Sequence, residues 1–335
     1  MTAATDPTAL SLNENPFPPL ASVQAALSTS IEAANRYPEY LPERLRALIA
    51  DRIGVAGEQV VIGVGASGVI MQLLHAVTDP GDTVVTATPT FDGYPIFARM
   101  ARLRSVTVAL DGHGRNDLDA MASAAAGARV AVVCRPHNPT GTVESAVDLE
   151  WFLDRVPSET VVLLDEAYAE FLPPGLRLDT ASLIVRYPNL VVARTFSKAY
   201  GLAGLRIGYG FCAPDLARRL WSMQLPFGMA ITALVAVAAS FAAEPELQQR
   251  IRMIAAERRY LQTRLRAAGV DCTDSHANFV YLPGDWRGVF GGTGLRVRHY
   301  ADGVRITVGD RASTRAVLAA AASAANPREA SVDAV

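Results

Sequence analysis

Short apolar runs alternate with amphipathic stretches over the first part of the chain. Runs rich in β-branched residues predict strands at residues 59–62, 83–87, 104–109, 129–134, 160–164, 190–193 and 207–212. Helical patterns lie between them, for example at residues 69–78, 148–155 and 215–221. Several strands are apolar on both faces, which is typical of strands covered by helices on both sides. This alternation predicts an α/β fold with a mostly parallel central sheet.

The pattern changes after Glu244. A long charged helix is predicted over residues 245–268. Short strands at residues 279–282, 295–297 and 304–308 and an alanine-rich helix from about residue 313 follow it. This order is typical of a small α+β lobe. We therefore expect an N-terminal arm with part of the small domain at residues 1–35, a large domain at 36–230 and a small C-terminal domain at 231–335.

Composition excludes several classes of protein. Half of the 335 residues are hydrophobic, which is enough to bury a large core. The net charge of −2 offers no basic surplus for a nucleic-acid partner. The scattered residues Cys134, Cys212 and Cys272 predict neither a disulfide framework nor a metal site, so we expect a reducing, cytoplasmic location. The longest apolar stretch, residues 229–243, is shorter than the roughly 20 residues of a spanning helix. We expect it to be a buried helix and expect no membrane partner.

A glycine-rich turn follows the first strand. The run Gly63-Val64-Gly65-Ala66-Ser67-Gly68 matches the G-x-G-x-x-G pattern of dinucleotide-binding proteins, so an NAD-dependent dehydrogenase is one hypothesis. The next strand lacks the expected acid at its end, since it runs into Thr88-Pro89 and Asp82 lies at its start. The turn still places free amides and Ser67 at a helix N-terminus, which favours a phosphate site over a turn that merely needs glycine.

Polar side chains follow three successive strands of the predicted sheet. The residues after the strands at 129–134, 160–164 and 190–193 include, in that order, Asn138, then Asp165 with Tyr168, then Ser197 with Lys198. Because parallel strands end at one edge of a sheet, we expect these groups to meet there. A carboxylate directly after the apolar run VVLL is costly unless a cation or several donors meet it. A structural Asp165 that caps the next helix is the alternative.

Lys198 has two interpretations. It could form a plain buried ion pair with Asp165. The apolar, glycine-rich stretch that follows it would instead lower its pKa, and a neutral lysine can act as a Schiff-base nucleophile. Asp165 could then pair with the protonated pyridine nitrogen of pyridoxal 5'-phosphate (PLP). Phe91, at another strand end, could stack on the cofactor ring or simply pack in the core.

Ordered motifs over nearly the whole chain resemble those of PLP-dependent aminotransferases of the aspartate aminotransferase fold (class I/II), and most of all the histidinol-phosphate aminotransferases. The motifs are LNENP at 12–16, RYPE at 36–39, PTFDGY at 89–94, HNPTG at 137–141, DEAY at 165–168, SKAYGLAGLRIGY at 197–209, NF at 278–279 and VRITVG at 304–309. The resemblance implies the three-layer PLP-transferase fold (fold type I) and PLP as the cofactor.

The resemblance also assigns cofactor roles to single residues. Lys198 would form the Schiff base, Asp165 would hold the ring nitrogen, and Tyr168 would contact the phenolic oxygen. The resemblance places further cofactor contacts at Ala66, Ser67, Phe91, Asn138, Ser197 and Arg206. Tyr37 would reach the phosphate of a neighbouring subunit, which implies a homodimer with shared active sites, although a turn aromatic before Pro38 is the alternative.

Three residues are implied as substrate contacts. Arg305 would hold the substrate carboxylate, Arg298 would contact a substrate phosphate, and Asn15 belongs to the substrate-facing arm. For Arg298 an exposed basic strand edge is the alternative. Two departures from the family pattern, His137 and Phe17, fall near the side-chain pocket or the arm and leave the donor open.

These patterns predict a PLP-dependent aminotransferase. It would transfer an amino group between a histidinol-phosphate-like or aromatic donor and 2-oxoglutarate through the Lys198 Schiff base, and histidine biosynthesis is the pathway that the resemblance suggests. A PLP-dependent decarboxylase of threonine phosphate, of the kind found in cobalamin synthesis, shares every cofactor residue and is the main alternative. The NAD-dependent dehydrogenase is a remote one.

Overall fold

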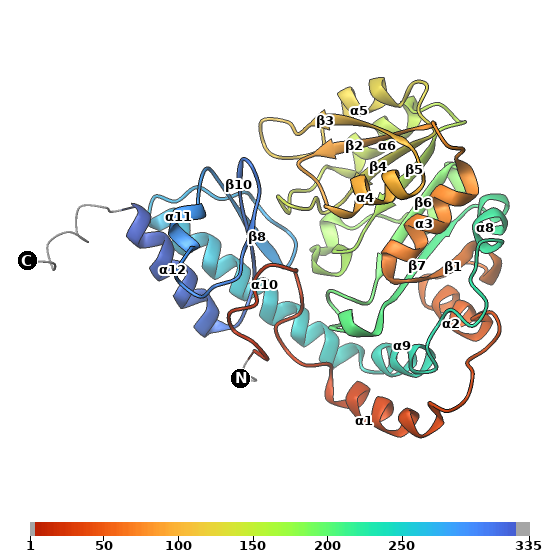
Figure 1. Cartoon of the computed structure of the whole chain (residues 1–335), viewed down its shortest axis with the longest axis horizontal. Helices are drawn as coiled ribbons and strands as arrows, with labels where there is room; N and C mark the ends of the chain where they lie inside the picture. Colours follow the sequence, from red (N-terminus) through yellow and green to blue (C-terminus); the bar gives the residue numbers. More distant parts are fainter. Residues whose placement is uncertain (1–3, 326–335) are drawn as a thin grey trace, which may run out of the picture.

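Two sheets organise the chain in the computed structural model, which describes residues 4–325 and is drawn in Figure 1. The large sheet contains β1 (Val60–Val64), β2 (Thr83–Thr88), β3 (Arg104–Ala109), β4 (Val130–Cys134), β5 (Val161–Asp165), β6 (Leu190–Thr195) and β7 (Ile207–Cys212). Its strand order is β1-β7-β6-β5-β4-β2-β3. β7 is antiparallel to both of its neighbours, so the other six strands share one direction and end at one edge. The predicted α/β fold with a mostly parallel sheet is confirmed.

Helices cover both faces of this sheet. They are α1 (Ala21–Ser30), α2 (Glu43–Ile53), α3 (Gly65–Val77), α4 (Gly93–Met100), α5 (Leu118–Ala125), α6 (Ala146–Arg155), α7 (Thr180–Arg186), α8 (Pro214–Trp221) and α9 (Thr232–Ala242). Side chains of β4 alternate between two apolar cores. Val132 packs with α3, α4 and α8, whereas Val133 packs on the other face with α5, α6 and α9. The predicted buried helix at 229–243 is α9, and no helix within residues 4–325 is both long and apolar enough to cross a membrane.

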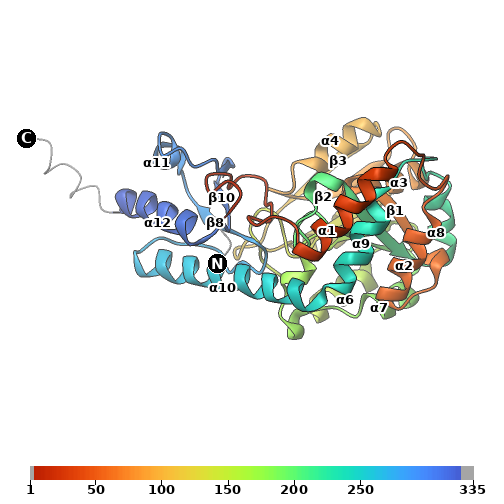
Figure 2. The same ribbon diagram turned by 90° about the horizontal axis from the view of Figure 1, so that it is seen from below.

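A small antiparallel sheet forms the second lobe. It contains β8 (Phe279–Pro283), β9 (Arg298–His299) and β10 (Gly303–Thr307) in the order β8-β10-β9, with α10 (Glu244–Ala267), α11 (Arg287–Phe290) and α12 (Arg311–Ala325) around it. Figure 2 shows α10 running from this lobe to the large one. Its first half packs in the core of the large sheet through Leu247 and Ile251, and its second half packs in the small core through Leu261 and Leu265. The boundary after residue 230 therefore stays a prediction, and residues 1–3 and 326–335 of the expected domains lie outside the described part.

The strand predicted at residues 295–297 is wrong, because β9 comprises Arg298–His299. Leu295 and Val297 pack against the small core without joining the sheet. Arg296 forms a single bridge with Ala9 of the N-terminal arm instead. The alternation of apolar residues at 295–297 therefore reflects packing of Leu295 and Val297 against the small core. Pairing with β10 begins only at Arg298.

The topology also excludes the NAD-dependent dehydrogenase. The turn Gly63–Gly68 does join a strand to a helix, as the motif predicts. β1 nevertheless lies at the edge of the sheet beside the antiparallel β7, and four strands separate it from β2. A dinucleotide-binding unit requires these two strands in one βαβ crossover, so the turn serves another purpose here.

Gly208 of β7 provides a test of how tightly the sheet is packed against the start of α3. A methyl group on Gly208 would lie 2.3 Å from the backbone nitrogen of Ala66 and 2.3 Å from the carbonyl carbon of Gly65, where only main chain is present to move. We expect Gly208→Ala to lower the free energy of unfolding by about 1–3 kcal/mol, the usual range for overpacking. Urea unfolding measures this, and Gly57→Ala is the control, because a methyl group there meets no atom within 4 Å. Equal stability of the two variants would contradict this packing.

Candidate active site

A cavity of about 490 Å³ opens at the carboxyl edge of the large sheet, between the two lobes and the N-terminal arm. It is lined by the sequence-predicted residues Ala66, Ser67, Phe91, Asn138, Asp165, Tyr168, Ser197, Lys198, Arg206, Arg298 and Arg305. The arm adds residues 11–14 to the wall. The shared direction of six strands is what brings groups so distant in sequence to one place.

Asp165 is the buried carboxylate of the site. It is the last residue of β5 and is 4% exposed. One carboxylate oxygen accepts the amide of Ala167 at 3.1 Å, and the other accepts the hydroxyl of Tyr94 at 2.7 Å. Burial raises the pKa of Asp165, while the Tyr94 hydrogen bond and the charge of Lys198 oppose that rise. The carboxylate is thus oriented, and a cation bound beside it would favour its ionised form.

Lys198 faces the same cavity and is the only lysine in the 335-residue sequence. Its Nζ donates to the carbonyl of Leu12 at 2.9 Å and not to Asp165, so the plain ion pair is not formed. Burial lowers the pKa of Lys198 to about 8, and the positive charge of Arg305 acts in the same direction. A much larger fraction of such an amine is neutral near physiological pH than of an ordinary lysine, and the neutral form is suited to nucleophilic attack on a carbonyl.

An anion site lies at the start of α3. Gly65 begins this helix with φ of 70°, and a methyl group on it would lie 2.4 Å from Nη2 of Arg206. The Arg206 guanidinium donates to the hydroxyl of Ser197 at 3.3 Å, and that hydroxyl also accepts from Thr195 at 3.0 Å. A guanidinium, hydroxyls and the free amides of a helix N-terminus together form a site that favours a phosphate.

A hydrogen-bond network joins the far wall to the small lobe. The hydroxyl of Tyr168 accepts from Asn13 at 3.0 Å and from Asn138 at 3.4 Å. The side-chain oxygen of Asn138 in turn accepts from Arg305 of β10. Burial raises the pKa of Tyr168 well above its usual value, so its hydroxyl keeps its proton. Arg305 also donates to Tyr300 and is 5% exposed.

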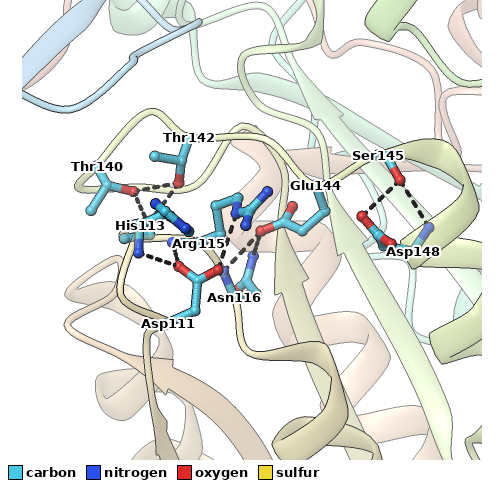
Figure 3. Close-up of polar contacts among 10 residues, drawn as sticks. Asp111, His113, Arg115, Asn116, Thr140, Thr142, Glu144, Ser145 and Asp148 are labelled. Atoms are coloured by element: carbon cyan, nitrogen blue, oxygen red, sulfur yellow. Dashed lines mark hydrogen bonds and ion pairs between the residues drawn. The ribbon is translucent and has the colours of Figure 1, made fainter.

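The loop that follows β4 and carries Asn138 is anchored at its far end, as Figure 3 shows. The hydroxyls of Thr140 and Thr142 both donate to the carbonyl of Gly114, at 2.7 and 2.6 Å. The carboxylate of Glu144 accepts the backbone and side-chain amides of Asn116 at 2.8 and 2.9 Å. These bonds hold the loop over the sheet edge, so its asparagine reaches the cavity from a fixed position.

Two sequence-predicted residues lie outside this cavity. Tyr37 is 83% exposed and packs on Phe227, with ring centroids 4.9 Å apart. Asn15 donates to the carbonyls of Ala199 and Lys198, at 3.0 and 3.4 Å, and so supports the lysine loop instead of lining the cavity.

Sequence reasoning missed three residues that take part in the site. Asn13 and Tyr94 lie within the quoted motifs LNENP and PTFDGY, and Asp92 is also in the latter. Asn13 contacts Tyr168, Tyr94 contacts Asp165, and Asp92 pairs with Arg298. The motifs signalled these segments, but spacing alone did not indicate which members face the cavity.

Comparison with known proteins identifies the family. The model of the family described as aminotransferase class I and II matches residues 5–285. This chain belongs to the class I and II aminotransferases. It is 44% identical to an aromatic amino acid aminotransferase of Rhodococcus opacus, covering 94% of this chain and 89% of that one. A relative of the same name from Streptomyces coelicolor is 43% identical, covering 90% of this chain and 86% of the other.

A solved structure supports the same conclusion. Histidinol-phosphate aminotransferase from Sinorhizobium meliloti, in complex with PLP, superposes with a TM-score of 0.87 at 28% identity, covering 96% of this chain and 91% of the other. The predicted fold type I, the PLP cofactor and the transaminase activity are therefore confirmed. The cavity of this aminotransferase fits the cofactor, because it combines an anion site, a buried carboxylate and a nucleophilic amine.

Tyr94→Phe tests the support of Asp165. Loss of this hydrogen bond to a buried carboxylate raises the pKa of Asp165 further, and such bonds contribute about 1.5–3 kcal/mol. We expect PLP affinity and kcat to fall about tenfold or more, measured by cofactor titration and steady-state rates. Tyr187→Phe is the matched control, because it removes a 2.7 Å bond to Asp154 away from the cavity. The same loss in both variants would contradict a specific role for Tyr94.

The pKa of Lys198 predicts a pH dependence. Its value of about 8 means that the amine is protonated below this pH and neutral above it, instead of changing near 10.5. Only the neutral amine attacks an aldehyde, so we expect the rate of covalent PLP uptake by the apoenzyme to rise up to about pH 8 and then level off. Stopped-flow absorbance measures this rate, and Lys198→Ala, which leaves no lysine, is the control. A rate that still rises steeply beyond pH 9.5 would contradict the lowered pKa.

Proposed function

We propose that this enzyme transfers the amino group of an aromatic amino acid to 2-oxoglutarate. Arg305 is the observation that carries the proposal. Arg305 lines the cavity, and its guanidinium donates to the neutral groups of Asn138, Tyr300 and Ser11. Its Nε has no hydrogen-bond partner within residues 4–325. An unneutralised, nearly buried guanidinium fits the α-carboxylate of an amino acid through paired hydrogen bonds.

The choice of an aromatic side chain rests on the relatives. Two of them, at 44% and 43% identity over most of the chain, are named aromatic amino acid aminotransferases. The structure named for histidinol phosphate is only 28% identical. Phe91, Leu12 and Ile70 add apolar surface to the cavity wall, which suits an uncharged ring. Histidinol phosphate is the second candidate donor, because Arg298 lines the same cavity.

Each cavity residue then has a role toward the cofactor and the donor. Bound PLP supplies an electron sink for the electrons released at the donor α-carbon. Asp165 would hold the proton on the ring nitrogen, and Lys198 Nζ is the proposed point of covalent attachment. Once free, the same Nζ accepts the proton from the donor α-carbon as general base. Tyr168 and Asn138 orient the ring from the side.

The phosphate would lie among Ser197, Arg206 and the amides of Ala66 and Ser67. Tyr37 is exposed on its own chain, which agrees with a homodimer in which it reaches the neighbouring site. A cytoplasmic location also remains part of the proposal. The decarboxylase of threonine phosphate uses the same cofactor contacts and is separated from the proposed activity by its product.

A donor panel tests the proposal. We expect phenylalanine and tyrosine to support glutamate formation from 2-oxoglutarate with kcat/KM at least about tenfold above that for histidinol phosphate, and threonine phosphate to release no carbon dioxide. Arg305→Ala should raise KM for every donor while PLP stays bound, because a charged hydrogen bond to the substrate is lost. A preference for histidinol phosphate, or carbon dioxide from threonine phosphate, would overturn the assignment.

A further inference from the structure

Two arginines lie side by side on the small sheet where it lines the cavity. Arg298 of β9 is the direct cross-strand partner of Arg305 in β10, and both line the cavity. Like charges at opposite positions of two strands destabilise the pair unless one of them is neutralised. The described residues give Arg305 no acidic partner within 4.0 Å, whereas Arg298 has one.

That partner is Asp92. Its carboxylate lies 2.8 Å from Nη2 of Arg298, and both side chains are about half exposed. Asp92 occupies the N-cap position of α4, where an aspartate usually accepts a backbone amide, but its side chain makes no capping bond. The carboxylate is turned to the arginine of the other lobe instead. The hydrogen bond with Asp92 also raises the pKa of Arg298.

We propose that Asp92 is a specificity-determining residue, which neutralises Arg298 and so disfavours ligands with an anionic group at the far end of the cavity. This inference deepens the proposed function and rests on it. Arg305 stays available for the α-carboxylate, and the neutral Asp92–Arg298 pair faces the side chain of the donor. A phosphate there would meet the carboxylate of Asp92 and gain little from Arg298.

The pair is weak enough to allow a complete transamination cycle. Half-exposed ion pairs contribute only about 0.2–1 kcal/mol. The second carboxylate of 2-oxoglutarate can therefore compete with Asp92 for Arg298, at a cost in affinity. Asp92 thus sets the balance between uncharged and anionic side chains without excluding the acceptor.

Two unreactive ligands make the test independent of which donor is used. Both 3-phenylpropionate and 3-phosphonopropionate carry one carboxylate for Arg305 and lack an amino group, so neither is turned over. Their dissociation constants with the PLP-loaded enzyme are measured by calorimetry. For Asp92→Asn, which keeps the size of the side chain, we expect the affinity ratio to shift toward 3-phosphonopropionate by about fivefold or more.

The shift must depend on Arg298. In the double variant Asp92→Asn with Arg298→Gln we expect it to disappear, because the released guanidinium is the group that binds the phosphonate. Asp215→Asn is the control, since it removes another aspartate–arginine pair, with Arg218 on α8. An unchanged ratio in Asp92→Asn, or a shift that survives the loss of Arg298, overturns the inference.

A second variant keeps the test decisive if Asp92→Asn folds poorly. Asp92→Ser removes the same carboxylate and should shift the affinity ratio in the same direction, because Arg298 again loses its partner. An unchanged ratio in this variant would show that Asp92 does not neutralise Arg298 in the native enzyme. The donor panel tests the proposed function independently, because it compares donors in the native enzyme, whereas the role of Asp92 is tested by ligand affinities of its variants.

Discussion

The burial of one carboxylate and one amine in a shared cavity is the constraint on which the site depends. Desolvation raises the pKa of Asp165, which is buried, and lowers the pKa of Lys198, which is partly buried. Either group in isolation would be costly, and direct pairing would leave a plain ion pair. The structure keeps them apart by giving Lys198 the carbonyl of Leu12 and Asp165 the hydroxyl of Tyr94. The pair is thereby kept ready for a cofactor that carries both a carbonyl and a basic ring nitrogen.

The residues at the carboxyl edge of the large sheet were predictable, because each of them lies next to a strand in the sequence. The bounds of β3 and β7 agree with the predicted strands. Asp165 ends β5, and Asn138 and Lys198 follow β4 and β6 within a few positions. Strand direction then brings them together. A further local signal was overlooked, since one lysine among thirty-one basic residues already points to Lys198. The chain therefore has a single side-chain ε-amine that can attack an aldehyde.

Contacts between lobes were beyond the reach of sequence patterns. In LNENP, Asn15 was chosen as the cavity residue, yet Asn13 reaches Tyr168. Asn13 has a left-handed backbone with φ of 54°, and its amide donates to Thr307 of the small sheet, a contact that spacing along the arm does not encode. The pairing of Asp92 with Arg298 has the same origin, as does the shift of β9, because both depend on how the arm and small lobe pack against the large sheet.

The cavity is therefore lined by residues from both sheets, and the two groups differ in their proposed roles. Cofactor chemistry belongs to the carboxyl edge of the large sheet, whose residues are held by strands buried on both faces. In the proposed specificity, the charge of the ligand is sensed at β9 and β10 of the small lobe, where Arg298 and Arg305 are cross-strand partners and Asp92 pairs with Arg298. α10 packs in both cores and so joins the small sheet to the large one. A change at Arg298 would leave the hydrogen bonds of Asp165 to Tyr94 and Ala167 in place, whereas a change at Arg305 would also act on the pKa of Lys198.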